Sequence, residues 1–170
     1  MPSILFVCTA NLYRSPLAAA FFFRKLTAEG LTRRWRVASA GTWTTSGQRV
    51  PSNVLLAAGA AGLDLASHLT RQVDRDLLAR FDLILVMEKG HREALRIEFP
   101  FVQEKVHLLS EVADQLEYDV ADPANSGLAT SEIVAAISGL IDRAYPHICQ
   151  LVESEKSVPN RSGHHVNVTL

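Results

Sequence analysis

The apolar residues of this chain fall into short runs that are separated by polar loops. Residues 3–8 form a nearly continuous apolar run, which is typical of a strand buried on both faces of a parallel sheet. The predicted strands cover residues 3–8, 35–40, 82–87 and, with a weaker pattern, 105–109. The predicted helices cover residues 16–29, 50–62 and about 128–152. Ser15 and Pro16 are expected to cap and to open the first helix.

Strands and helices alternate along the chain. This order predicts an α/β fold, an open four-stranded parallel sheet with helices on both faces. Residues 1–153 are expected to form one domain, because the chain has the length of one ordinary domain. Residues 154–170 are polar and lose the apolar periodicity, so we expect a flexible C-terminal tail there.

The composition bears on the location and the partners of the protein. Apolar residues make up 48% of the 170 residues, and no apolar run approaches the roughly 20 residues of a membrane helix. The N-terminal residues lack the pattern of a secretory signal, and two cysteines are too few for a disulfide framework. We therefore expect a cytoplasmic protein without a membrane partner. The formal net charge of -1 gives no general case for binding nucleic acid.

The loop between the first predicted strand and the first predicted helix carries the candidate chemistry. In an open parallel sheet, ligands bind beyond the carboxyl ends of the strands, and the N–H groups of a helix N-terminus favour an anion. Cys8 lies at the start of this loop, and Arg14 lies six residues further on. The sequence therefore predicts a phosphate site. The predicted phosphate-binding residues are Thr9, Ala10, Asn11, Leu12, Tyr13, Arg14 and Ser15.

Several residues of this loop have a chemical role in that interpretation. The backbone N–H groups would stabilise the thiolate form of Cys8, which would then act as the nucleophile. Arg14 would bind phosphate oxygens with its planar guanidinium. Asn11 readily adopts the left-handed backbone conformation that a tight loop needs, and Ser15 could donate a hydrogen bond to the sulfur. A cysteine that ends a strand is commonly a packing residue, so the whole arrangement favours catalysis more than the spacing alone.

Further short segments accompany the Cys-x5-Arg-Ser-Pro motif that begins at Cys8. These segments are Ser39-Ala40-Gly41-Thr42, Gly62-Leu63-Asp64-Leu65, His68-Leu69-Thr70-Arg71, Asp82-Leu83-Ile84-Leu85-Val86-Met87 and Asp122-Pro123. Together, over about residues 4–152, the motif and these segments resemble the low-molecular-weight protein tyrosine phosphatase family.

The resemblance implies a hydrolase that removes phosphate from phosphotyrosine through a cysteinyl-phosphate intermediate on Cys8. It implies that Asp122 is the general acid and then the general base. Ser39 and His68 are implied to orient Asn11 through hydrogen bonds. No metal or other cofactor is implied. The implied partner is a tyrosine-phosphorylated protein, and bacterial relatives indicate a tyrosine kinase of polysaccharide export.

The chain departs from the family pattern at several positions around the site. Tyr13 replaces a second cysteine that many members use in a protective disulfide, so that redox switch should be absent. Ala10 replaces a glycine, and its Cβ would be strained if the backbone there needed a positive φ. Ala124 and Asn125 follow Asp122-Pro123, where many members have aromatic residues that wall the substrate cleft.

Two other side chains bear on the choice of substrate. Trp43, in the loop after the second predicted strand, is a candidate aromatic wall from the opposite side of the cleft, although it could equally be a packing residue. Leu12 favours phosphotyrosine, because similar bacterial enzymes that act on phosphoarginine tend to have threonine at that position.

Two alternative functions stay open from the sequence. One is a non-catalytic phosphotyrosine-binding module, although such a module has no use for both a nucleophile and an acid. The other is a thiol-dependent arsenate reductase, which shares the loop but needs further cysteines in the middle of the chain. The second cysteine here, Cys149, lies in the final predicted helix and is expected to be a packing residue.

Overall fold

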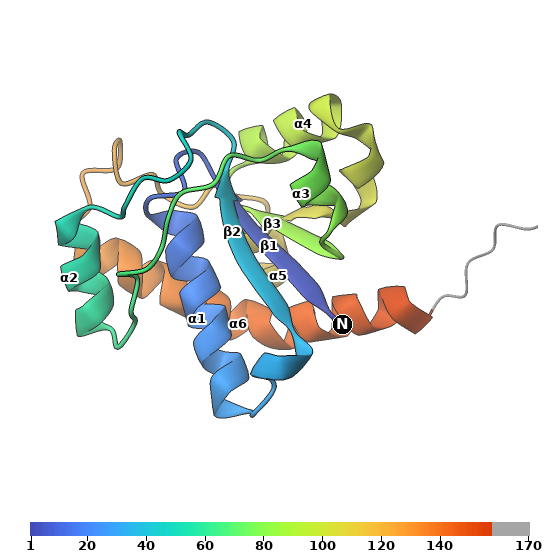
Figure 1. The fold of residues 1–170 in the computed structure, drawn as a ribbon, viewed down its shortest axis with the longest axis horizontal. Coiled ribbons are helices and arrows are strands. Elements are labelled where there is room, and N and C mark those ends of the chain that lie inside the picture. The colour runs from blue at the N-terminus through green and yellow to red at the C-terminus, as the bar shows by residue number, and fades with distance from the viewer. Residues whose placement is uncertain (158–170) are drawn as a thin grey trace, which may run out of the picture.

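Four parallel strands form the sheet, as the sequence predicts. The computed structural model describes residues 1–157 of the chain. Its strands are β1 (Ser3–Cys8), β2 (Arg36–Gly41), β3 (Leu83–Val86) and β4 (Val106–Leu108). All pairings are parallel, and the strand order is β2-β1-β3-β4 (Figure 1). The predicted four-stranded parallel sheet is therefore confirmed.

β1 lies in the middle of the sheet, between β2 and β3. All of its residues are buried, which explains the continuous apolar run in the sequence. Cys8 lies opposite Gly41 of β2, and Val7 lies opposite Val86 of β3, so the carboxyl ends of these three strands meet at one edge. At such an edge an open parallel sheet positions its ligand site.

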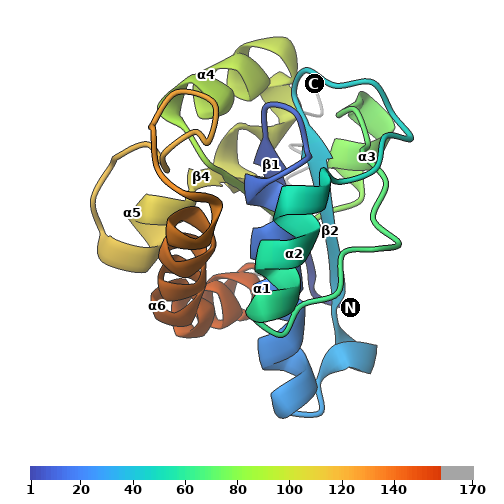
Figure 2. The same ribbon diagram turned by 90° about the vertical axis from the view of Figure 1, so that its left-hand side faces the viewer.

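Helices cover both faces of the sheet (Figures 1 and 2). The helices on one face are α1 (Arg14–Ala28), α2 (Ser52–Ala60), α5 (Leu109–Asp114) and α6 (Thr130–Ser157). The helices on the other face are α3 (Arg75–Ala79) and α4 (Lys89–Glu98). Two short 3-10 helices, η1 (Thr32–Arg34) and η2 (Pro100–Lys105), precede β2 and β4. The expected coverage of both faces is thus confirmed.

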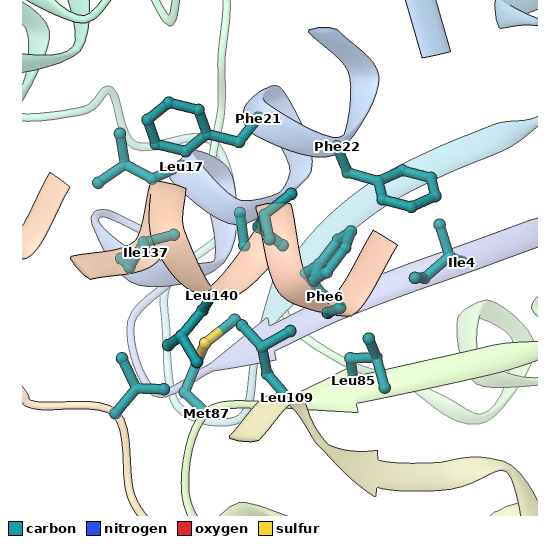
Figure 3. Close-up of a cluster of buried hydrophobic side chains, with 14 of the residues drawn as sticks. Ile4, Phe6, Leu17, Phe21, Phe22, Leu85, Met87, Leu109, Ile137 and Leu140 are labelled. Atoms are coloured by element: carbon teal, nitrogen blue, oxygen red, sulfur yellow. The ribbon is translucent and has the colours of Figure 1, made fainter. Parts of the chain in front are cut away.

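Side chains of β1 alternate between two apolar clusters. Ile4 and Phe6 belong to the larger cluster with α1 and α6, whereas Leu5 and Val7 belong to the cluster with α3 and α4. Figure 3 shows the larger cluster, where side chains of α1 and α6 meet those of the sheet. Because β1 contributes to both clusters, the position of its C-terminal residue is fixed from both faces.

Phe22 of α1 lies at an aromatic junction in the larger cluster. Its ring is fully buried, and its centroid lies 5.8 Å from that of Phe6 and 5.3 Å from those of Trp35 and Tyr145. These tilted and edge-on arrangements are the ones that aromatic pairs prefer. Phe22 therefore joins α1 to β1, to Trp35 directly before β2 and to α6.

Three helices of the fold were not predicted. α3 and α5 have only 5 and 6 residues, which is too short for an apolar period to be recognised. α4 is longer, but the only side chains that it buries are His91 and Leu95. Few buried apolar residues therefore mark α4 as a helix in the sequence.

The predicted N-cap of α1 is wrong. Tyr13 is the N-cap residue, and Ser15 lies inside the first turn. The Ser15 hydroxyl is buried and bonds to groups of the candidate site instead of capping the helix.

The predicted end of the last helix is also wrong. α6 continues to Ser157 and so crosses the domain boundary that was expected after residue 153. Residues 158–170, the rest of the predicted tail, lie outside the described residues. Among residues 1–157, no helix has the length and apolar character needed to cross a membrane.

Replacing Phe22 by alanine should lower the free energy of unfolding by about 3–5 kcal/mol, because the change removes a buried ring and leaves a cavity. Urea denaturation measures this loss. The matched control is Phe23→Ala at the next position of α1, where the residue is 49% exposed and the expected loss is below ~1 kcal/mol. Equal losses for the two variants would contradict the assignment of Phe22 to the core junction.

Candidate active site

The loop after β1 turns sharply at Asn11. This residue has a φ of 56°, in the left-handed region, and its backbone N–H donates to Sγ of Cys8 at 3.3 Å. Asparagine tolerates this conformation better than most residues. Ala10 is not among the residues with a positive φ, so the strain expected from its Cβ is absent. The loop therefore folds over the sulfur at the position that asparagine fills.

The side chain of Asn11 ties this loop to the rest of the fold. The residue is fully buried, and its Nδ2 donates to Oγ of Ser15 and to Oγ of Ser39, both at 2.9 Å. Its Oδ1 accepts a hydrogen bond of 2.9 Å from the N–H of Arg71. The carbonyl oxygen of Asn11 lies 3.0 Å from Nε2 of His68. Ser39 and His68 thus both contact Asn11, the residue that they are expected to orient.

The hydroxyl of Ser15 lies between the sulfur and the backbone. Its Oγ is 3.1 Å from Sγ of Cys8, and it donates to the carbonyl of Ala40 at 3.2 Å. A hydroxyl has one hydrogen to donate. When Cys8 carries a proton, the thiol can donate to Ser15, and when Cys8 is a thiolate, the hydroxyl can turn and donate to the sulfur. Ser15 can therefore follow either protonation state of Cys8.

The guanidinium of Arg14 joins the loop to two carboxylates. Arg14 is buried, and its Nη1 donates to Oε1 of Glu88 at 2.5 Å and to the carbonyl of Val120 at 2.9 Å. Its Nη2 donates to Oδ2 of Asp122 at 3.2 Å. A buried cation needs such partners, because its removal from water is costly. The ion pairs hold this cation at the carboxyl edge of the sheet.

Asp122 lies in the long loop between α5 and α6. Its Oδ1 accepts a hydrogen bond of 2.9 Å from the N–H of Ala124, and its carbonyl accepts from the N–H groups of Asn125 and Ser126. These bonds form a turn directly after the carboxylate. The turn fixes the carboxylate facing Arg14.

One cavity collects the three residues expected to carry the chemistry. It has a volume of about 270 Å³. Its lining residues are Cys8, Thr9, Ala10, Leu12, Tyr13, Arg14, Asp122, Pro123 and Ala124. A larger hollow of about 510 Å³ lies against α1 and β2, where Ser39 and His68 line it, but it contains none of the three. The arrangement of the reactive groups therefore locates the candidate site at the smaller cavity.

The predicted site residues differ in how they lie around this cavity. Asn11 and Ser15 do not line it, and their hydrogen bonds hold the loop. Trp43 is 83% exposed, so it is not a packing residue, and it lines a neighbouring hollow that meets the cavity at Ala10. Within residues 1–157, no group of three or more His, Cys, Asp or Glu side chains is arranged to hold a metal ion.

His91 contacts the loop from α4. Its Nε2 lies 2.8 Å from Oγ1 of Thr9, while its Nδ1 is buried and has no hydrogen-bond partner among the described residues. Burial lowers the pKa of His91 below its ordinary value; the carboxylate of Glu88 opposes this shift, and the cation of Arg14 adds to it. The neutral imidazole is therefore the form that the folded structure favours.

Glu88, His91 and Gly41 were not predicted as site residues. Glu88 and His91 follow β3 at the carboxyl edge of the sheet. Their place directly after a predicted strand could have marked them as candidate site residues. Gly41 pairs with Cys8 in the sheet, and a Cβ on it would lie 2.5 Å from the carbonyl oxygen of Thr9. Only glycine allows this close approach of strand and loop.

The chain is thus an open α/β sheet protein with a Cys-x5-Arg loop at the carboxyl edge of its sheet. The model of the family described as low molecular weight phosphotyrosine protein phosphatase matches residues 3–158. The chain belongs to this family and is a hydrolase of the protein-tyrosine-phosphatase class.

Individual proteins are similar to this chain over most of its length. The low molecular weight protein-tyrosine-phosphatase Wzb of Escherichia coli strain K12 is 32% identical over 91% of this chain and 97% of that protein. The structure of a low molecular weight protein tyrosine phosphatase from T. tengcongensis has a TM-score of 0.74 and 32% identity, over 84% of this chain and 97% of that one. The YwlE arginine phosphatase from Geobacillus stearothermophilus has a TM-score of 0.79 and 25% identity, over 94% of this chain and 99% of that one.

Replacing Gly41 by alanine should lower kcat/KM toward p-nitrophenyl phosphate by about 10- to 100-fold, because the new Cβ displaces the loop at Thr9. Steady-state kinetics measure this loss. The matched control is Gly59→Ala in α2, where an added Cβ meets no atom within 4 Å and activity should not change. Full activity in the Gly41 variant would show that the loop adapts without cost.

Replacing His91 by asparagine should weaken the pH dependence of folding stability. Because the pKa of His91 is lowered in the folded state, the unfolded chain binds more protons as the pH falls through about 6.5. The stability contributed by the neutral imidazole is present above that pH and is lost as the pH falls through the folded pKa. Melting temperature measured from about pH 7.5 to pH 5 should therefore fall more steeply in the wild type than in the variant. The control is His107→Asn, in which another histidine is replaced in the same way. Parallel curves for the wild type and the His91 variant would contradict this linkage.

Proposed function

We propose that the chain hydrolyses phosphotyrosine in proteins, and small aryl phosphates, through a cysteinyl-phosphate intermediate on Cys8. One observation carries this proposal: Cys8, Arg14 and Asp122 come from β1, α1 and a distant loop, and all line one cavity. A nucleophile, a fixed cation and an acid around one cavity are the groups that displacement at phosphorus requires.

In the first proposed step, Sγ of Cys8 forms a bond to phosphorus while the bond between phosphorus and the tyrosine oxygen breaks. The electron pair of the broken bond leaves with the phenolate oxygen, and Asp122 gives that oxygen a proton. Arg14 and the backbone N–H groups of residues 9–15 bind the three non-bridging oxygens. The N-terminus of α1 supports this role, because the first N–H groups of a helix have no partner within it and favour an anion.

Substrate binding changes the partners of Arg14 in this scheme. The contacts with Glu88, Val120 and Asp122 use three of the five N–H donors of the guanidinium, so two donors are left for phosphate oxygens. A phosphate dianion beside Arg14 competes with Asp122 for the cation.

In the second proposed step, water attacks the phosphorus of the cysteinyl-phosphate. The carboxylate of Asp122 takes a proton from the water, the phosphorus–sulfur bond breaks, and inorganic phosphate leaves. The sulfur of Cys8 departs as a thiolate, to which the hydroxyl of Ser15 can donate a hydrogen bond. All of these steps use side chains and backbone groups of the chain itself.

The preference for phosphotyrosine over phosphoarginine depends on Leu12. A relative with the same fold is described as an arginine phosphatase, so the fold alone does not choose between the two substrates. Leu12 is aliphatic and lines the cavity, and the family resemblance associates threonine at this position with phosphoarginine. Leu12 therefore supports an aromatic leaving group.

The proposal extends to a partner and a compartment. The proposed partner is a tyrosine-phosphorylated protein, and the family resemblance implies a bacterial tyrosine kinase of polysaccharide export as its candidate. The proposed compartment is the cytoplasm, where thiols such as those of Cys8 and Cys149 stay reduced.

The geometry disfavours the two alternative functions. An arsenate reductase needs a second thiol that reaches Cys8, but Cys149 interacts with Glu29 at the C-terminal end of α1, whereas Cys8 lies near its start. A helix of 15 residues is about 22 Å long, which is too far for direct exchange. Burial also raises the pKa of the Cys149 thiol and makes it a poor nucleophile. A binding module without turnover would not need Asp122 facing Arg14.

Cys8→Ser should abolish turnover of p-nitrophenyl phosphate and of phosphotyrosine peptides, because it removes the nucleophile, while phosphate binding is kept. Asp122→Ala should lower kcat by about 10²- to 10⁴-fold with a smaller effect on substrate affinity. Steady-state kinetics at pH 5 to about 7 with EDTA measure both effects. The matched controls are Cys149→Ser and Asp142→Ala, two residues of α6 away from the cavity, which should keep full activity. Normal turnover in the Cys8 or the Asp122 variant would reject that residue's role.

A further inference from the structure

Tyr13 is the one aromatic residue among those that line the cavity of the candidate site. Pro123 and Ala124, which follow Asp122 in the chain, also line this cavity, and neither has an aromatic side chain. Trp43 lies outside this cavity. Tyr13 is therefore the residue of this lining that offers a ring to an aryl phosphate whose phosphorus lies at Cys8.

The side chain of Tyr13 is held in place by two other helices. Its hydroxyl oxygen accepts a hydrogen bond of 2.5 Å from Nδ2 of Asn53 in α2, and it lies 3.5 Å from Oγ1 of Thr130, the first residue of α6. Nδ2 of Asn53 also lies 3.3 Å from Oγ1 of Thr130. The ring itself packs against the larger apolar cluster. Tyr13 is thus fixed from α1, α2 and α6, and a ring that is fixed in advance loses little entropy when a ligand binds.

The position of Tyr13 in the chain also suits contact with a leaving group. It precedes Arg14 directly and caps α1, so its Cα is fixed relative to the groups proposed to bind phosphate. Aromatic pairs with offset or edge-on geometry gain affinity beyond that of simple apolar contact.

We propose that the ring of Tyr13 is the aromatic wall of the substrate cleft, a specificity-determining residue that favours aryl over non-aryl phosphates. Asn53 and Thr130 act as positioning residues that hold this wall through its hydroxyl. The inference rests on the proposed function, because it places the phosphate of the ligand at Cys8. It also gives a role to a residue that replaces a cysteine of the family pattern.

The test compares two ligands that share the phosphate site, inorganic phosphate and phenylphosphonate, by isothermal titration calorimetry. Tyr13→Leu should weaken phenylphosphonate binding by about 2- to 10-fold and leave phosphate binding unchanged. Unchanged phosphate binding also shows that the loop of the variant is still folded. Asn53→Ala keeps the ring but removes its tether, and it should give a smaller loss that is again limited to phenylphosphonate.

Four results would contradict the inference. Tyr13→Leu with wild-type affinity for phenylphosphonate would overturn the role of the ring, and so would a loss that appears in Trp43→Leu but not in Tyr13→Leu. Equal losses for both ligands in Tyr13→Leu would mean that the side chain supports the loop rather than the aryl group. If wild-type protein binds neither ligand, the proposed function itself fails, and the role of Tyr13 fails with it.

Discussion

The buried side-chain amide of Asn11 holds the loop between β1 and α1 in its observed conformation. A left-handed backbone costs a non-glycine residue about 1–3 kcal/mol, and asparagine less than most, so it persists only where the surroundings enforce it. Around Asn11 the enforcement comes from Ser15, Ser39 and Arg71, which satisfy every polar atom of the side-chain amide. With this side chain fixed, the N–H of Asn11 is aimed at the sulfur of Cys8. The position of the proposed nucleophile relative to its loop follows from that single buried group.

The sheet supplies the second fixed reference for the site. Beyond their paired ends, β1 and β2 stay in contact, because the N–H groups of Thr42 and Trp43 donate to the carbonyls of Cys8 and Thr9 at 2.9 Å. Gly41 makes this approach possible, since any side chain there would meet the carbonyl of Thr9. The loop is therefore held both by backbone hydrogen bonds to the segment that follows β2 and by the side chain of Asn11. Such double fixation suits a site in which small displacements are costly to the reaction.

The sequence predicts those parts of this protein whose signals are local. The buried run of β1, the four strands and the Cys-x5-Arg loop all follow from short patterns, and so does the left-handed turn at Asn11. Contacts between distant segments leave no such pattern. Glu88 and His91 meet the loop only because β3 lies beside β1, and α4 was missed because it buries so few apolar side chains. The contact of Ser15 with Cys8 was expected from the sequence, but its assignment as the N-cap was wrong, because Tyr13 occupies that position.

The two carboxylates on Arg14 have different parts in the proposed reaction. Asp122 must alternate between acid and base, and each change of protonation state alters its attraction for the guanidinium. A buried arginine that lost its only anionic partner would be strongly destabilised. Glu88 prevents this, because it contacts Nη1 independently of the bond between Nη2 and Asp122. In the proposed reaction, the contact with Glu88 would thus hold Arg14 in place while Asp122 exchanges protons with the substrate and with water.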